Sequence, residues 1–240
     1  MRRAPAGREG RGLAPAYTGA ARRTRVPAGN GAAMGLLDLF RRKPPIASAA
    51  CLEDFLDAQS AFLVQKCIFE YSRARSGVLS SKLFKEPAFR AAVETARWRN
   101  YPLCLQNVAV MAEHALRPHA GDAMAMRQGL IAAVGRVCRR YPAPAGFDPK
   151  FWSEAEARIG QRIQRAGLAA PHAVKDLPTE TAKEFFAGLP IHADLRGYDF
   201  ELVTNNIRVN LCRAHEDFLK AADLPAVAEA LAAEGAELWA

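Results

Sequence analysis

Apolar residues recur at steps of three and four between Tyr198 and Leu219, which is the spacing of one face of an α-helix. This apolar stripe consists of Phe200, Val203, Ile207, Leu211, Ala214 and Phe218. A polar stripe runs beside it and consists of Asn206, Asn210, Arg213 and Asp217. Leu202 and Val209 lie nearly opposite the apolar stripe. We therefore expect a helix that is apolar on two sides and packs between two neighbours.

The same periodicity predicts helices along most of the chain. The expected helices cover residues 50–75, 88–98, 103–116, 123–141, 149–167, 178–188 and 225–238. Short turns of helix are expected within 78–85 and 191–198, Tyr101-Pro102 predicts a kink or a boundary, and residues 168–178 predict a loop. No useful run alternates apolar and polar residues. The pattern predicts an all-α fold, a single orthogonal or irregular bundle of seven to nine helices with a disordered N-terminal extension.

The first 45 residues differ in composition from the rest of the chain. Residues 1–33 are rich in glycine, alanine, proline and arginine and have almost no large apolar residues, so we expect disorder. Met34 opens the segment MGLLDLFRRKPP, and we interpret it as the natural start of the protein. The helical domain is expected over residues 46–240. Within it, the proline-rich stretch 142–148 either divides two lobes or forms an excursion from one domain.

Charge and cysteine usage restrict the function classes. The net charge is +8, but residues 1–33 hold seven arginines and one glutamate and account for +6 of it. The predicted domain is close to neutral, which argues against nucleic-acid binding based on overall charge. The cysteines are odd in number, have no CxxC spacing and lie mostly at apolar helical positions. We therefore expect free thiols and a cytoplasmic protein, and no run of 18 apolar residues predicts a transmembrane helix.

A short apolar and then basic segment follows Met34. Its residues are Leu36, Leu37, Phe40, Arg41, Arg42 and Lys43. Such a segment is suited to weak contact with an anionic membrane surface. The alternative is that its leucines dock onto the protein's own domain.

Polar residues gather in the C-terminal third of the sequence, where we place the candidate site. The candidate ligand-binding residues are His192, Asp194, Asn206, Asn210, Arg213 and Arg208. One hypothesis is a polar pocket for a small anionic ligand, clamped by Arg208 or Arg213. The other hypothesis is an internal hydrogen-bond network that orients packed helices, with Gln59, Lys66 and Glu70 as its partners.

Other kinds of chemistry find little support in the sequence. There is no HExxH or paired ExxH motif for a metal, no GxSxG elbow, and no phosphate-binding glycine loop, so no metal and no cofactor are expected. The best nucleic-acid candidate is the run from Arg97 to Tyr101, which mixes charge and aromatic rings. We therefore expect a helical adaptor or assembly protein that binds a protein partner. A helical enzyme or sensor for a small anionic ligand, and a peripheral membrane protein, remain as alternatives.

Overall fold

The computed structural model describes residues 45–238, which form nine α-helices and three 3₁₀ segments and contain no strand. The predicted all-α irregular bundle is confirmed. The helices are α1 (Ala49–Ser76), α2 (Ser80–Leu83), α3 (Pro87–Leu116), α4 (Ala123–Cys138), α5 (Phe151–Gly167), α6 (Ala182–Ala187), α7 (Ala193–Arg196), α8 (Phe200–Ala221) and α9 (Leu224–Glu237). The 3₁₀ segments are η2 (Gly77–Leu79), η3 (Arg117–His119) and η4 (Val174–Glu180). The expectations of disorder, of a start at Met34 and of membrane contact through residues 36–43 concern residues outside this range.

Side-chain caps set the ends of several helices. The Ser48 hydroxyl accepts from the Cys51 amide at 3.3 Å at the start of α1, and Asp122 accepts from two amides at the start of α4. Asp223 accepts from the Ala226 amide at 3.2 Å and begins α9. Such caps satisfy amides that have no partner inside the helix. Gly77 ends α1 with a φ of 51°, which side chains other than glycine rarely tolerate.

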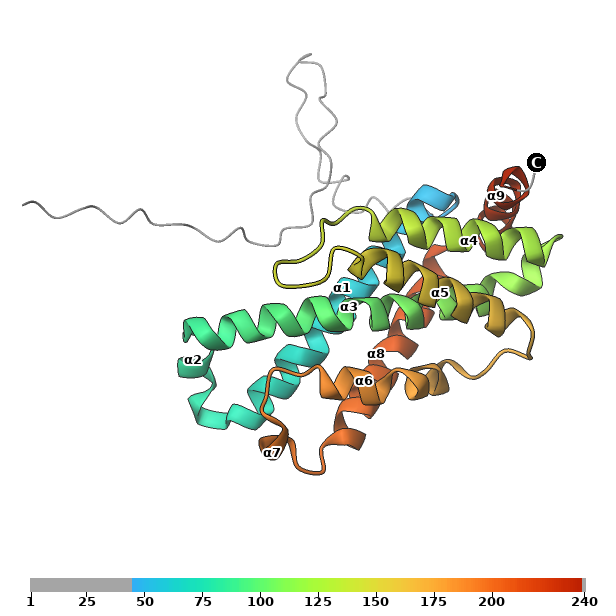
Figure 1. Cartoon of the computed structure of the whole chain (residues 1–240). Helices are drawn as coiled ribbons and strands as arrows, with labels where there is room; N and C mark the ends of the chain where they lie inside the picture. The colour runs from blue at the N-terminus through green and yellow to red at the C-terminus, as the bar shows by residue number, and fades with distance from the viewer. Residues whose placement is uncertain (1–44, 239–240) are drawn as a thin grey trace, which may run out of the picture. The chain divides into compact units, whose positions relative to one another are not determined.

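Helix α3 lies at the centre of the bundle, with α4 and α5 running along it (Figure 1). It continues through Pro102, so the predicted kink or boundary at Tyr101-Pro102 is wrong as a helix end. A proline inside a helix costs about 3 kcal/mol because it removes one amide donor and crowds the preceding turn. All residues from Asn100 to His114 are buried in this helix. Packing on all sides therefore holds the helix together across the proline.

Residues 168–178 were expected to form a loop leading into a helix at 178–188. The structure instead forms the 3₁₀ segment η4, and α6 begins later, at Ala182. Leu177 and Pro178 are buried there. A tight 3₁₀ turn accommodates a proline and still places these two apolar side chains inside the bundle.

Helices α4 and α9 touch through their backbones. A side chain added at Gly129 would place its Cβ 2.0 Å from the carbonyl oxygen of Leu231, and one added at Gly235 would lie 1.9 Å from that of Ala125. Only glycine permits this approach at the two positions. The C-terminal helix is thereby held tightly against α4.

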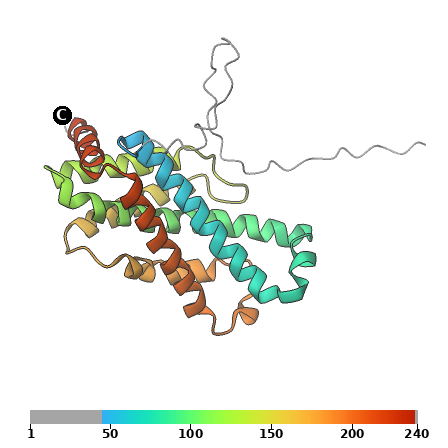
Figure 2. The ribbon, with the colours of Figure 1, turned by 180° about the vertical axis from the view of Figure 1, so that it is seen from behind.

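Helices α1 and α8 lie side by side on the face shown in Figure 2, where they run in opposite directions. Their ends are tied near Ile46, whose amide donates to the Ala221 carbonyl at 2.9 Å. Further along the pair, the rings of Phe55 and Phe218 have centroids 4.9 Å apart. Within residues 45–238, no helix combines the length and apolarity that crossing a bilayer requires.

One expectation about α8 is wrong. The stripe from Phe200 to Phe218 does face the core, but Leu202 and Val209 on the other side are 58% and 50% exposed. Helix α8 therefore packs on one side only. Its second apolar stripe faces solvent instead of a neighbouring helix.

Candidate functional site: a groove between α1 and α8

An open groove of about 310 Å³ lies along the α1–α8 pair. Helix α1 contributes Lys66 and Glu70. The residues lined up on α8 are Leu202, Asn205, Asn206, Val209, Asn210 and Arg213. The groove is therefore polar along its α1 side and mixed apolar and polar along α8.

A chain of hydrogen bonds joins the two helices in this groove. Lys66 Nζ donates to Glu70 Oε1 at 2.6 Å, and Asn206 Nδ2 donates to Glu70 Oε2 at 2.9 Å. Asn206 Oδ1 in turn accepts from Asn210 Nδ2 at 2.8 Å and from Cys67 Sγ at 3.1 Å. The expected partners Lys66 and Glu70 thus join the asparagines, whereas Gln59 does not line the groove. The two asparagines are held in defined orientations by these bonds.

Two ionisable groups of this hydrogen-bond network, Cys67 and Glu70, have shifted pKa values. Burial and, to a lesser extent, the nearby Glu70 carboxylate raise the pKa of the Cys67 thiol to about 12. Hydrogen bonds from Lys66 and then from Asn206 lower the pKa of Glu70. At neutral pH Cys67 is therefore a protonated donor and Glu70 an ionised acceptor. The thiol is unsuited to act as a nucleophile, and the carboxylate is unsuited to act as a base.

Two polar groups of the groove lack a strong partner. Asn210 Oδ1 is shielded from solvent and accepts no hydrogen bond, although the residue is only 5% exposed. Arg213 is exposed, and no carboxylate of the described residues lies within ion-pairing distance of its guanidinium. Arg213 acts on Glu70 only through its charge. Arg213 is therefore accessible to an anion, whereas the Asn210 oxygen is an unsatisfied acceptor that is shielded from solvent.

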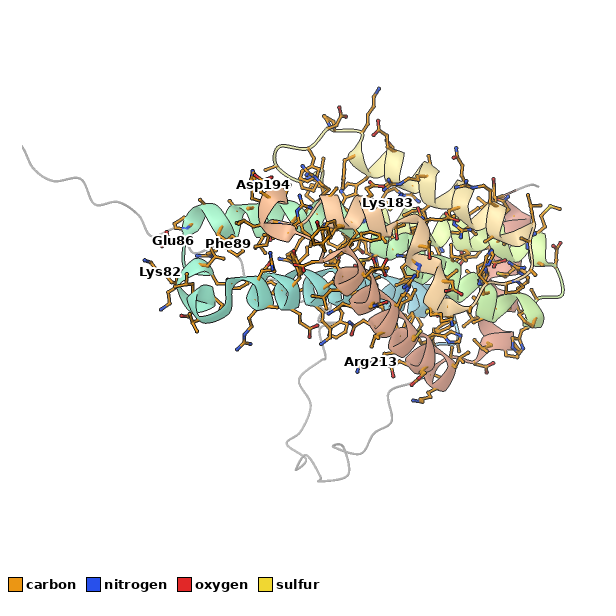
Figure 3. All side chains as sticks on the ribbon, turned by 90° about the horizontal axis from the view of Figure 1, so that it is seen from below. Lys82, Glu86, Phe89, Lys183, Asp194 and Arg213 are labelled. Carbon is orange, nitrogen blue, oxygen red and sulfur yellow. The ribbon has the colours of Figure 1, made fainter. Side chains whose placement is uncertain are left out.

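Asn206, Asn210 and Arg213 are the predicted site residues that the structure brings together. Figure 3 shows Asp194 on α7 and Arg213 on α8 at separate places on the bundle. His192 and Asp194 are both exposed and contact each other, with His192 Nδ1 3.4 Å from Asp194 Oδ2. Arg208 donates to Asn205 Oδ1 at 3.1 Å and does not line the groove.

The short helix α7 explains this separation. Arg75, at the end of α1, donates to the Leu195 carbonyl and pairs with Asp199 at 3.1 Å. The connector is held at the C-terminal end of α1 by these contacts, away from Arg213. His192 and Asp194 therefore lie away from Arg213 in the structure, although they are near it in the sequence. Cys67 was not predicted as part of the site, although it follows Lys66 directly on the same turn of α1.

A second polar cluster is structural in character. The carboxylate Oδ1 of Asp57 accepts from the hydroxyls of Tyr101 at 2.6 Å and Tyr141 at 2.7 Å. Trp98 packs against Tyr141 with ring centroids 5.4 Å apart, and Tyr101 is 3% exposed. Aromatic rings of the run from Arg97 to Tyr101 thus pack within the protein. Tyr101 is buried and Trp98 partly buried by this packing.

Comparisons with known proteins yield no relative: no family model matches the sequence, and no curated protein or solved structure matches it significantly. In the described part of the chain, no three histidine, cysteine, aspartate or glutamate side chains are placed to hold a metal ion.

Proposed function

We propose that this protein is a helical binding protein that holds a segment of a partner protein in the α1–α8 groove. The observation that carries the proposal is the second apolar stripe of α8, formed by Leu202 and Val209, which remain at least half exposed among residues 45–238. Uncovered apolar surface beside polar groups is typical of protein-interaction sites.

The apolar surface extends onto α1. Phe62 and Phe69 are 55% and 40% exposed near Lys66 on that helix, although neither lines the groove itself and the Phe69 ring stacks on Phe84. The Lys66 ammonium lies 5.8 Å from the centroid of the Phe62 ring. An open groove flanked by large apolar side chains suits an elongated segment, because a small molecule would leave most of this surface exposed.

Catalysis at the groove finds less support. The Cys67 thiol is protonated and the Glu70 carboxylate is strongly ionised, so neither has the pKa of an activated nucleophile or a general base. The remaining lining residues bind rather than react. All five cysteines are free, which supports the expectation of a reducing, cytoplasmic environment as part of this proposal.

Site-directed photocrosslinking in cells of the source organism tests the proposal. A photoreactive phenylalanine is placed at Val209 or Leu202 in the groove, or as a control at Leu219, which is 46% exposed on another face of α8. We expect one discrete adduct from Val209 and Leu202 and none from Leu219. The same adduct must disappear when Val209→Glu is combined with the reactive residue at Leu202.

Equal crosslinking from all three positions, or none from the two groove positions, would contradict the proposal. Val209→Glu lies on the surface, and such changes shift the free energy of unfolding by no more than about 0.5 kcal/mol. A thermal melt of that variant therefore distinguishes lost binding from lost folding.

A further inference from the structure

The direction of the hydrogen-bond chain in the groove follows from its charged end. The ionised carboxylate of Glu70 only accepts hydrogen bonds, so Asn206 turns its NH₂ group towards Glu70. Its oxygen then faces Asn210 Nδ2 and the Cys67 thiol, which both donate to it. Asn210 also donates to the Asn206 carbonyl at 2.8 Å. The donors of Asn210 are therefore used within the protein, and its oxygen is left over.

The Asn210 oxygen can be satisfied only by a hydrogen-bond donor from outside this network. A buried carbonyl without a hydrogen bond costs about 1–3 kcal/mol. Asn210 lines the groove together with Lys66 and Arg213, whose side chains are long and flexible. Asn210 is only 5% exposed and its oxygen is shielded from solvent, so a partner reaches the oxygen only after neighbouring side chains move aside. To stabilise it, the partner must carry an N–H or O–H group.

Arg213 adds a second requirement. It lies three residues after Asn210, so the two side chains are neighbours on the surface of α8, with Cβ atoms about 5–6 Å apart. Guanidinium groups bind carboxylates through two parallel hydrogen bonds. Lys66, the other cation of the groove, is already bonded to Glu70. A ligand carboxylate is therefore best placed on Arg213.

Leu202 and Val209 add a third requirement. Both line the groove and are at least half exposed, so they favour an apolar group of the ligand. Val209, Asn210 and Arg213 lie within about one helical turn, so this part of the groove favours a donor, a carboxylate and an apolar group placed close together.

We propose that the groove recognises the C-terminal residue of a partner polypeptide. The terminal carboxylate binds Arg213, the amide N–H of the same residue donates to Asn210 Oδ1, and its apolar side chain contacts Val209. In a terminal residue these three groups are joined to one Cα atom. An internal aspartate or glutamate would use its side chain for the carboxylate and have none left for the apolar contact. This inference rests on the proposed function, because it specifies which part of the partner enters the groove.

Peptide arrays test the inference on the full-length protein. Random heptapeptides attached through their N-termini are probed in two matched forms, one with free C-terminal carboxylates and one with C-terminal amides. The best free-acid peptide is then titrated by fluorescence anisotropy against the wild-type protein, Arg213→Gln and, as a control, Arg165→Gln. Arg165 is exposed on α5, away from the groove. N-acetyl-leucine serves as a small carboxylate in the same assay.

We expect apolar C-terminal residues among the free-acid binders. Dissociation constants should rise at least tenfold on amidation or in Arg213→Gln and stay unchanged in Arg165→Gln, with equal melting temperatures for all three proteins. Equal binding of acids and amides would overturn the C-terminal inference and leave groove binding intact. If the protein binds N-acetyl-leucine but none of the peptides, the idea that the ligand is a polypeptide would be overturned. Absence of all peptide binding would overturn both the inference and the proposed function.

Discussion

Asn206 Oδ1 accepts a hydrogen bond from Asn210 Nδ2 at 2.8 Å, one helical turn along α8. Through Asn206 this bond connects Asn210 to the charged pair of Lys66 and Glu70 on α1. The pair of asparagines therefore serves two purposes. It joins two helices, as an internal network would, and it leaves a residue that lines the groove, Asn210, with an oxygen that accepts no hydrogen bond.

The Asn210→Leu variant separates these two purposes. It removes both hydrogen bonds that Asn210 donates to Asn206 and also a buried oxygen that has no donor. Because these effects oppose each other, we expect the free energy of unfolding to change by no more than about 1 kcal/mol. Binding of the free-acid peptide should weaken at least tenfold. Urea denaturation and anisotropy on the same preparation measure both quantities. A large loss of stability would instead mean that the amide is mainly structural.

The close approach of α4 and α9 predicts a strong effect of two added methyl groups. Gly129→Ala or Gly235→Ala would force the helices apart, because each new Cβ would lie within 2.0 Å of a carbonyl oxygen. We expect a loss of at least about 1–3 kcal/mol in the free energy of unfolding. Gly121→Ala is the control, since nothing lies within 4 Å of its added Cβ. If all three variants denature at the same urea concentration, the tight packing of α9 is wrong.

His114 predicts a stability change below neutral pH. Burial lowers its pKa in the folded protein, although the adjacent Glu113 acts in the opposite direction. The unfolded chain therefore binds the proton more readily than the folded chain, and stability is full above a pH of about 6.5 and falls as the pH drops towards the folded pKa. His114→Gln should reduce the loss of stability between pH 7 and pH 5. Replacing the exposed His119 with glutamine should leave the loss unchanged, and an unaltered slope in His114→Gln would refute the assignment.

Thiol reactivity tests the environment of Cys67, which bonds to the groove residue Asn206. Cys51 is exposed, whereas Cys67 is buried and its pKa is raised to about 12. A disulfide reagent at pH 8 should modify Cys51 in the native protein and leave Cys67 unmodified until urea unfolds the chain. Mass spectrometry of the digested protein gives the site of modification. Rapid labelling of Cys67 in the native state would show that the bond to Asn206 does not hold it.

Helical periodicity was sufficient to predict the class of fold and the core face of α8. It could not tell whether the second apolar stripe of α8 is covered, because Leu202 and Val209 look alike in sequence whether a helix or solvent lies beside them. Local sequence rules also could not predict that α3 continues through Pro102, because this depends on the burial of the helix around the proline.

Sequence alone also could not show which of the six predicted site residues lie together in space. Asn206, Asn210 and Arg213 follow one helical stripe and therefore come together in the groove. His192 and Asp194 precede them by a connector whose path depends on the contacts of Arg75 at the other side of the bundle. Such long-range contacts leave no periodic signal in the sequence.

The most direct test of the groove as a binding surface is a titration of the ¹⁵N-labelled protein with the best free-acid peptide, followed by NMR of the asparagine side-chain amides. The account predicts that the signals of Asn206 and Asn210 shift on peptide addition, while those of the buried Asn100 and Asn107 on α3 stay in place. Saturating peptide that leaves Asn206 and Asn210 unchanged, or that shifts Asn100 and Asn107 instead, would contradict it.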